Sequence, residues 1–351
     1  MRTTDVFVKG IGVCLPEPVS VEWAVAQGLH PAGSAAAHGL TGATVAGDVP
    51  APEMALRAAE DACKRGGQRP DEVDLLLYTD TWHQGPDGWQ PQYYLQRHLV
   101  GDGVLAVETQ HGCNGMFSAL ELAAAYLGAD DARRAALIVS ADNYGTPLVD
   151  RWNAGPGFVV GDAAASVVLS RDEGFARLLS VGSVTVPDGE ELHRAGEPLF
   201  PPGATTGSTM DFNVRAAAFL AEAKARASAA GGGPSLWLRV HQKLAESVHR
   251  ALAEADVELA DIARVIFMNN DRETVGERCM GALGLPLSKS TWEYGRTVGH
   301  LGASDQIVSL NHLLETGELG PGDRVLLAGM APGVTLSSAV VEIVGTPPWL
   351  G

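Results

Sequence analysis

Two residues of reactive type, Cys113 and His300, stand in matching surroundings in the two halves of the sequence. Each directly follows a glycine, and each precedes an apolar run of helical character. Residues 112–127 lead through a charged turn into a strand-like segment, and residues 299–314 lead through a polar turn into another. Because self-similarity constrains a whole architecture, we expect two fused α/β halves that bring the thiol and the imidazole together.

The residue types point to covalent acyl chemistry. A cysteine at a helix start feels the positive end of the helix dipole, which stabilises its thiolate. Asp305 can hold the His300 imidazole in the tautomer that accepts a proton on its far nitrogen. The alternatives are a buried packing cysteine and a capping or core histidine, and the matched contexts favour catalysis. Three further histidines are interpreted as surface or packing residues: His83, His111 and His193.

Composition limits the possible partners and location. The net charge of −17 argues against nucleic acid and anionic membrane surfaces. No apolar run approaches the length of a membrane span, and Met1 leads into a strand-like segment without a signal-peptide core. The four cysteines show no metal-ligand spacing. We therefore expect a cytoplasmic protein with reduced thiols and no metal site.

Strand-like and helical segments alternate along the chain, which indicates an α/β fold. We expect an N-terminal half at 1–175, carrying the nucleophile, and a C-terminal half at 176–351, carrying the general base. Residues 186–210 are rich in proline and glycine and predict a functional or mobile loop. Two helices are expected at 211–229 and 234–255, separated by Gly231–Gly233. The glycine-rich turn at 328–335 can bring backbone amides close to a reacting centre.

The chain resembles the type III β-ketoacyl-ACP synthases of the thiolase superfamily over nearly its whole length. The resemblance rests on Leu15-Pro16-Glu17, residues 58–78, the helix after Cys113, residues 160–165, Tyr294-Gly295-Arg296-Thr297, Gly320-Pro321-Gly322-Asp323 and the final glycine turn. It implies a thiolase-like fold of two duplicated α/β halves with layered α-β-α-β-α architecture, a site between the halves and a homodimer. It also implies that Cys113 is the nucleophile, with acyl-ACP or acyl-CoA as donor and no further cofactor.

Two departures from the family separate this chain from its condensing members. Asn269 and Arg296 stand where those members carry the histidine and asparagine that drive decarboxylation of a malonyl thioester. The presence of His300 and Asp305 resembles the ketosynthase-like acyltransferases of antibiotic biosynthesis. That branch moves an acyl group, such as methylsalicylyl or malonyl, to a hydroxyl or amine of a sugar or aminocyclitol.

The resemblance also implies a substrate pocket and an oxyanion site. Pro332 replaces the glycine that normally offers an oxyanion N–H, so we expect the donors to be the amides of Cys113 and Gly333. The pocket is predicted to include Trp82, Trp89 and Asn269, with Trp89 placed like the aromatic residue that closes the partner subunit's pocket. Residues 21–47 contain Trp23 but no arginine or lysine, which favours a carrier-protein donor over CoA.

Two alternative functions remain open at this point. A condensing β-ketoacyl synthase with relocated catalytic residues would form carbon–carbon bonds and release carbon dioxide from a malonyl thioester. A non-catalytic ketosynthase-like partner subunit would not become acylated on Cys113. The predicted function is acyl transfer without decarboxylation, through a cysteine acyl-enzyme.

Overall fold

The computed structural model describes residues 1–230 and 235–351, so the expected helix break at Gly231–Gly233 lies outside the described residues. Its main sheet has the strand order β5-β4-β6-β7-β1-β8-β11-β10-β9. The strands are β1 Phe7–Cys14, β4 Leu75–Asp80, β5 Leu105–Gln110, β6 Ala135–Asp142, β7 Ala163–Ser170, β8 Ala176–Thr185, β9 Ile262–Ile266, β10 Arg324–Ala331 and β11 Thr335–Ile343. A small second sheet pairs β2 (Pro18–Ser20) with β3 (Gly42–Thr44).

Strand order and direction repeat in the two halves of the sheet. In the first half, β4 is parallel to β5 and β6, and β7 is antiparallel to β6 and β1. In the second half, β9 is parallel to β10, and β11 is antiparallel to β10 and β8. A parallel bridge between Val265 and Ser290 occupies the place that β5 has in the first half. The predicted fold of two similar α/β halves is confirmed, whereas the division of the chain at residue 175 stays a prediction.

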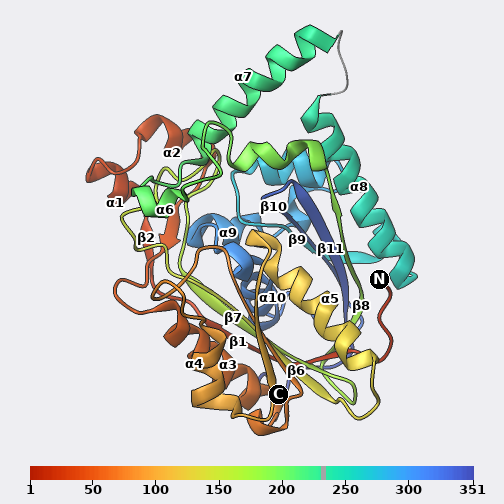
Figure 1. Ribbon diagram of the computed structural model, residues 1–351. Coiled ribbons are helices and arrows are strands. Elements are labelled where there is room, and N and C mark those ends of the chain that lie inside the picture. Colours follow the sequence, from red (N-terminus) through yellow and green to blue (C-terminus); the bar gives the residue numbers. More distant parts are fainter. Residues whose placement is uncertain (231–234) are drawn as a thin grey trace.

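Helices lie in three layers around these strands (Figure 1). Helix α3 (Ala51–Gly66) covers β1, β6 and β7, and α8 (Leu236–Ala255) covers β8 and β11. Between them, α5 (Gly115–Gly128) contacts β4, β6, β8 and β11, while α10 (Asp305–Glu315) contacts β1, β7 and β9. A helix that has strands on both sides is buried around its whole circumference. Most residues of α10 are buried in this way. This is the α-β-α-β-α arrangement expected from the sequence.

Glycines set the distance between α3 and the sheet. A Cβ on Gly10 would lie 2.1 Å from the carbonyl oxygen of Ala62, and one on Gly12 would lie 2.0 Å from that of Ala58. Because both contacts are with backbone, only glycine fits at these positions on β1. Hydrogen bonds between β1 and β8, at Phe7 and Arg177, join the strands of the two halves.

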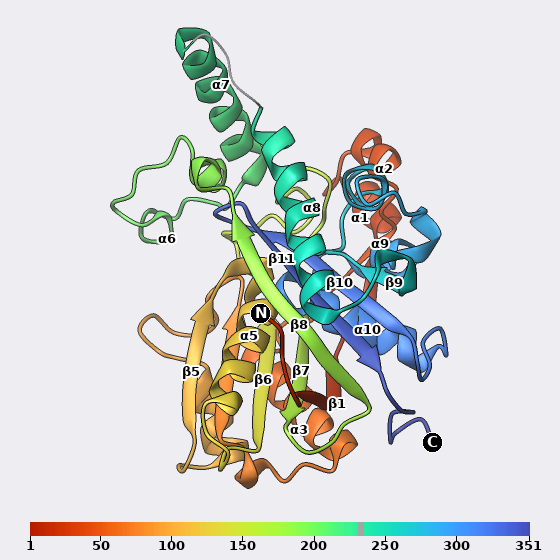
Figure 2. The ribbon, with the colours of Figure 1, turned by 90° about the vertical axis from the view of Figure 1, so that its right-hand side faces the viewer.

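The structure describes six further α-helices. They are α1 Val21–Ala26, α2 Ala32–His38, α4 Gln92–Leu95, α6 Gly203–Thr206, α7 Phe212–Ala230 and α9 Trp292–Val298. The expected loop at 186–210 contains α6 and a 3-10 turn at Pro187–His193. Helix α7 projects from the body of the molecule (Figure 2). In the described parts of the chain, no helix is long and apolar enough to cross a membrane.

Candidate active site

Cys113, His300 and Asp305 form one hydrogen-bonded chain in the folded protein. The Sγ of Cys113 lies 3.0 Å from Nε2 of His300. The other ring nitrogen, Nδ1, lies 2.5 Å from Oδ2 of Asp305. The His300 imidazole is buried and Cys113 is half-buried. The series of hydrogen bonds therefore leads from the more exposed residue, Cys113, into the core. The two reactive residues singled out from the sequence therefore meet.

A tight turn presents the thiol. Cys113 occupies a 3-10 turn at Gly112–Asn114 that continues into α5. Gly112 has a φ of +53°, a conformation that favours glycine, and a Cβ there would lie 2.8 Å from Cδ of Pro332. A Cβ on Gly115 would lie 2.0 Å from Oγ1 of Thr79. These glycines let the turn sit between the end of β4 and the β10–β11 hairpin.

The backbone of His300 is held on both sides by a single segment. Its N–H donates to the carbonyl of Val159 (2.8 Å), and its carbonyl accepts from the N–H of Gly161 (2.9 Å). The ring meets that of Phe158 edge to face, with centroids 5.4 Å apart. The imidazole therefore has little freedom to turn away from Cys113.

Asp305 is the first residue of α10, and its carboxylate is fully engaged. Besides the imidazole, Oδ2 accepts the N–H of Asn269 at 3.0 Å, and Oδ1 accepts the N–H of Leu301 at 2.8 Å. Because N–H groups from two different segments hold the carboxylate, its orientation is fixed. Asp305 can therefore orient the imidazole and stabilise its protonated form.

The electrostatics of the site place a proton on the imidazole. Burial alone would lower the pKa of His300, but the charges of Asp305 and Cys113 outweigh it and raise this pKa well above its usual value. The protonated imidazole has Nε2 beside the sulfur of Cys113, where it can donate a proton to a leaving group.

The two positions that depart from the condensing pattern have structural partners. The side-chain amide of Asn269 donates to the carbonyl of Gly299 at 2.8 Å, next to His300. Arg296 lies over the ring of Trp292, 4.7 Å from its centroid, and pairs with Glu293 at 3.3 Å. Asn269 thus braces the segment that carries His300, and its place in a substrate pocket stays a prediction.

The predicted pocket residues lie in two different settings. Trp82 and Phe158 both pack against the buried cluster that contains Tyr144, and Phe158 also contacts the His300 ring. Trp89 folds back onto its own loop, since a Cβ on Gly85 would lie 2.5 Å from its ring. The hairpin turn with Pro332 reaches Gly112, but the oxyanion roles of the Cys113 and Gly333 amides stay predictions.

Sequence reasoning missed three polar residues, Thr81, Asp142 and Tyr144. They lie at or just after the carboxyl ends of the parallel strands β4 and β6. Asp142 ends β6, and its Oδ1 accepts the N–H groups of Thr81 (2.8 Å) and Trp82 (2.9 Å). Burial raises the pKa of Asp142 to about 7, although these hydrogen bonds lower it. Tyr144 follows in the same segment and is buried. The available signal was polar side chains directly after buried strands, where α/β proteins bind ligands.

Other candidate groups lie apart from this hydrogen-bonded chain. Among the described residues, one group with metal-ligand spacing is Asp80, His83 and Glu108. Burial and the carboxylates Asp142 and Glu108 raise the pKa of Asp80 to about 8. Asp80 is therefore mostly protonated and uncharged at neutral pH. His111 contacts the hydroxyl of Ser118, and His193 packs edge to face on Phe212.

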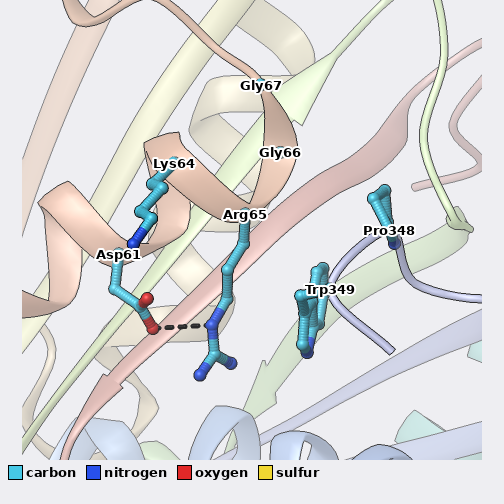
Figure 3. A pocket seen from close by; sticks show the side chains of 7 residues that line it. All are labelled: Asp61, Lys64, Arg65, Gly66, Gly67, Pro348 and Trp349. Carbon is cyan, nitrogen blue, oxygen red and sulfur yellow. Dashed lines mark ion pairs between the residues drawn. The ribbon is translucent and has the colours of Figure 1, made fainter. Parts of the chain in front are cut away.

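A surface cavity of about 510 Å³ lies elsewhere, between the C-terminal end of α3 and the last residues of the chain (Figure 3). Arg65 pairs with Asp61 there at 2.8 Å and lies over the ring of Trp349. Its lining shares no residue with the site at Cys113. We therefore assign it no part in the chemistry.

Comparisons with known proteins agree with this geometry. Residues 107–185 match the family model "3-Oxoacyl-[acyl-carrier-protein (ACP)] synthase III", and residues 252–343 match the model of its C-terminal part. A β-ketoacyl-ACP synthase III of Streptomyces coelicolor is 25% identical over 82% of each chain. The acetoacetyl CoA synthase NphT7 of Streptomyces sp. CL190 is 25% identical over 83% of each chain.

Two solved structures share this fold at very different sequence identities. The synthase III of Pseudomonas aeruginosa superposes with a TM-score of 0.76 at 20% identity, covering 97% of this chain and 99% of that one. ChlB3, described as an acyltransferase, superposes with a TM-score of 0.92 at 57% identity, covering 98% of this chain and 99% of that one. With the repeated thiolase-like halves and the cysteine at the start of α5, these matches show that the chain is a member of the 3-oxoacyl-ACP synthase III family of enzymes.

Proposed function

We propose that this protein is an acyltransferase that moves an acyl group from a thioester to a hydroxyl or amine through an acyl-enzyme on Cys113. The observation that carries the proposal is the chain Cys113–His300–Asp305, with distances of 3.0 and 2.5 Å. The 57% identity to ChlB3, described as an acyltransferase, supports the same reading. The proposed donor is acyl-ACP or acyl-CoA, and no metal or further cofactor enters the reaction.

The first half-reaction loads the enzyme. The Cys113 thiolate attacks the thioester carbonyl and forms a tetrahedral intermediate, whose oxyanion needs nearby N–H donors. The proposed donors are the amides of Cys113 and Gly333. When the intermediate collapses, the carbon–sulfur bond to the donor breaks, and the departing thiolate takes the proton from His300. The products are the acyl-enzyme and the free thiol of the donor.

The second half-reaction unloads it. The proton that His300 gave to the donor thiolate has left with the donor thiol. The imidazole is then neutral and can accept the proton of the acceptor hydroxyl or amine on Nε2. Asp305 stabilises the imidazolium as it forms. The acceptor oxygen or nitrogen bonds to the acyl carbon, and Cys113 leaves as thiolate.

Acyl transfer is favoured over condensation because the basic side chain beside the sulfur is that of His300, 3.0 Å away. Decarboxylation of a malonyl thioester in the family needs a histidine and an asparagine, and this chain has Asn269 and Arg296 at those positions. Both side chains have other partners, the carbonyl of Gly299 for Asn269 and Trp292 with Glu293 for Arg296. The proposed cargo is an aryl or short acyl group, and the proposed acceptor is a sugar or aminocyclitol.

A single-turnover assay tests the proposal. The enzyme is loaded with an acyl thioester, the donor is removed, acceptor is added, and the adduct mass is followed by intact-protein mass spectrometry. Cys113→Ala should form no adduct. His300→Ala should still load but should discharge about 10²- to 10⁴-fold more slowly, because it lacks the positioned base. His249→Ala, on the exposed face of α8, is the matched control and should discharge normally.

Three outcomes would contradict the proposal. An adduct that persists in Cys113→Ala, mapped to another residue, would move the nucleophile. Rapid carbon dioxide release from a malonyl thioester with a ketoacyl product would identify a condensing enzyme. A wild-type protein that takes up no acyl group would identify the non-catalytic partner subunit.

A further inference from the structure

The buried side chain of Asn114 joins the turn that carries Cys113 to the β10–β11 hairpin. Asn114 directly follows Cys113 and is 0% exposed. Its Nδ2 donates a hydrogen bond to the carbonyl oxygen of Thr335, the first residue of β11, at 2.9 Å. On its other side the amide faces β10, because a Cβ on Gly329 would lie 2.7 Å from Oδ1 of Asn114. The amide therefore contacts both strands of the hairpin, and the missing side chain of Gly329 leaves room for it.

The turn between β10 and β11 has a backbone shape that contacts around it must impose. Its φ is +83° at Gly333 and +52° at Val334. A positive φ is unfavourable for a β-branched residue, so Val334 keeps this conformation only where the surrounding structure holds it. The hydrogen bond from Asn114 to the residue after Val334 is one such contact. Another is the packing of Pro332 on Gly112, since a Cβ there would lie 2.8 Å from Cδ of Pro332.

The place of this turn matters for loading because of what happens to the thioester carbonyl. When the sulfur of Cys113 bonds to the carbonyl carbon, the carbonyl oxygen gains a negative charge that fixed N–H donors stabilise. The proposed donors, the amides of Cys113 and Gly333, lie on two turns from opposite halves of the chain. Both can act on one oxygen only when the two turns are held at a fixed separation. Asn114 spans these turns, since it adjoins Cys113 and its partner Thr335 lies two residues after Gly333.

We propose that Asn114 is a positioning residue: its amide holds the β10–β11 turn against the turn of Cys113, so that the N–H groups of Cys113 and Gly333 face the same thioester oxygen. The inference rests on the proposed function, because it assumes that a thioester loads Cys113. Asn114 acts through the backbone, separately from the chain Cys113–His300–Asp305 that moves the proton. A carbonyl oxygen only accepts hydrogen bonds, so the role requires a donor at position 114.

Two reactions of the same sulfur test this role. Loading by the acetyl and benzoyl thioesters of N-acetylcysteamine passes through an oxyanion, whereas alkylation by iodoacetamide is a direct substitution at a saturated carbon and does not. Asn114→Leu removes the donor with little change in volume, and Gly329→Ala adds a Cβ that displaces the amide from its other side. In both variants, loading should slow by about 10- to 10³-fold. Alkylation of Cys113, followed on its peptide by mass spectrometry, should keep the wild-type rate.

Ser247→Ala is the matched control. The hydroxyl of Ser247, on α8, pairs at 2.9 Å with that of Ser338 on β11, and both residues are buried. This variant also loses a buried hydrogen bond to β11, but one beyond the turn, so it should load at the wild-type rate. Thermal melting of each variant shows that the fold is kept.

Each outcome decides a different statement. Loading at the wild-type rate in both Asn114→Leu and Gly329→Ala would overturn the inference and leave acyl transfer intact. Equal losses of loading and alkylation would show that Asn114 shapes only the turn of the thiol, which would also overturn it. An equal loss of loading in Ser247→Ala would show a general effect of β11 in place of a role for Asn114. Failure of both thioesters to form a Cys113-dependent adduct on the wild-type protein would overturn the proposed function and, with it, this inference.

Discussion

At the residue scale, Asp305 holds the His300 imidazole by the nitrogen that faces away from Cys113. The 2.5 Å contact to Nδ1 and the N–H groups of Asn269 and Leu301 fix the carboxylate itself. A carboxylate at this position selects the tautomer whose Nε2 faces the sulfur. Orientation and charge stabilisation both depend on one side chain.

Replacing Asp305 by asparagine should therefore impair the transfer step. Asp305→Asn keeps an acceptor oxygen but loses the charge that stabilises the imidazolium, and its amide can hold the wrong tautomer. We expect discharge to acceptor to slow by about 10²-fold or more, with a smaller effect on loading. Single-turnover mass spectrometry measures both steps, and discharge at the wild-type rate would show that Asp305 is only structural.

The raised pKa of His300 leads to a prediction about pH. In the acyl-enzyme, the imidazole must be neutral to accept a proton, so discharge should slow as the pH falls below the pKa of His300 in that state. Loading uses the already protonated imidazole and should not share this acid limb. Rates of the two steps measured between about pH 5 and pH 9 test this. Identical acid limbs for loading and discharge would contradict it.

At the scale of elements, the parallel strands β4, β5 and β6 bring buried acids to one edge of the sheet. Asp80 ends β4 and has Asp142 from β6 and Glu108 from β5 as neighbours. Burial and these carboxylates raise its pKa from 3.8 to about 8. The folded chain thus keeps a proton on Asp80 that the unfolded chain releases.

This proton makes the contribution of Asp80 to stability depend on pH. Because the folded state binds the extra proton between the two pKa values, the contribution of Asp80 falls as the pH rises from about 4 to about 8. Asp80→Asn removes that loss, so the variant should gain stability relative to wild type between about pH 5 and pH 9.

Thermal or denaturant unfolding at the two pH values measures this difference. Asp131→Asn, at a fully exposed aspartate, is the control and should show no such trend. A stability difference for Asp80→Asn that stays constant with pH would show that Asp80 is ionised throughout.

At the scale of the whole molecule, a buried ion pair links the segments that brace the site. Asp162 accepts two hydrogen bonds from Arg151 at 2.9 Å and also those of the N–H groups of Ala46 and Tyr144. The carboxylate of Asp162 is fully buried and the side chain of Arg151 is 11% exposed. Gly161, next to Asp162, holds the backbone carbonyl of His300.

Breaking this pair should destabilise the protein strongly. Arg151→Ala leaves the charge of Asp162 buried and unpaired, which costs about 3–5 kcal/mol. Arg69→Ala removes a pair with Asp71 whose side chains are 67% and 61% exposed, and should change stability little, because solvent screens such a pair. Urea unfolding of both variants gives the comparison. Equal losses in the two variants would show that the buried pair adds nothing beyond a surface pair.

Local sequence patterns were enough to predict the repeated α/β halves and the residues Cys113, His300 and Asp305. In each half, the strand, the glycine turn and the central helix follow one another in a short stretch of sequence. Hydrophobic periodicity and turn residues within that stretch predict all three elements. The match between the turns at Gly112 and Gly299 then made the cysteine and histidine equivalent. Hydrophobic period and turn residues are local properties, so one sequence displays them directly.

Tertiary structure alone showed the pairing of Asn269 with Gly299, the ion pair of Arg151 and the cluster of Thr81, Asp142 and Tyr144 around Gly302. These residues come from different strands and loops, and no spacing along the chain signals that they meet. Their proximity follows from the strand order, which places the ends of β4 and β6 beside the turn before α10. Polar side chains in such places find their partners only when long-range strand pairing closes the fold, because hydrogen bonds act over a few ångströms in space and not along the sequence.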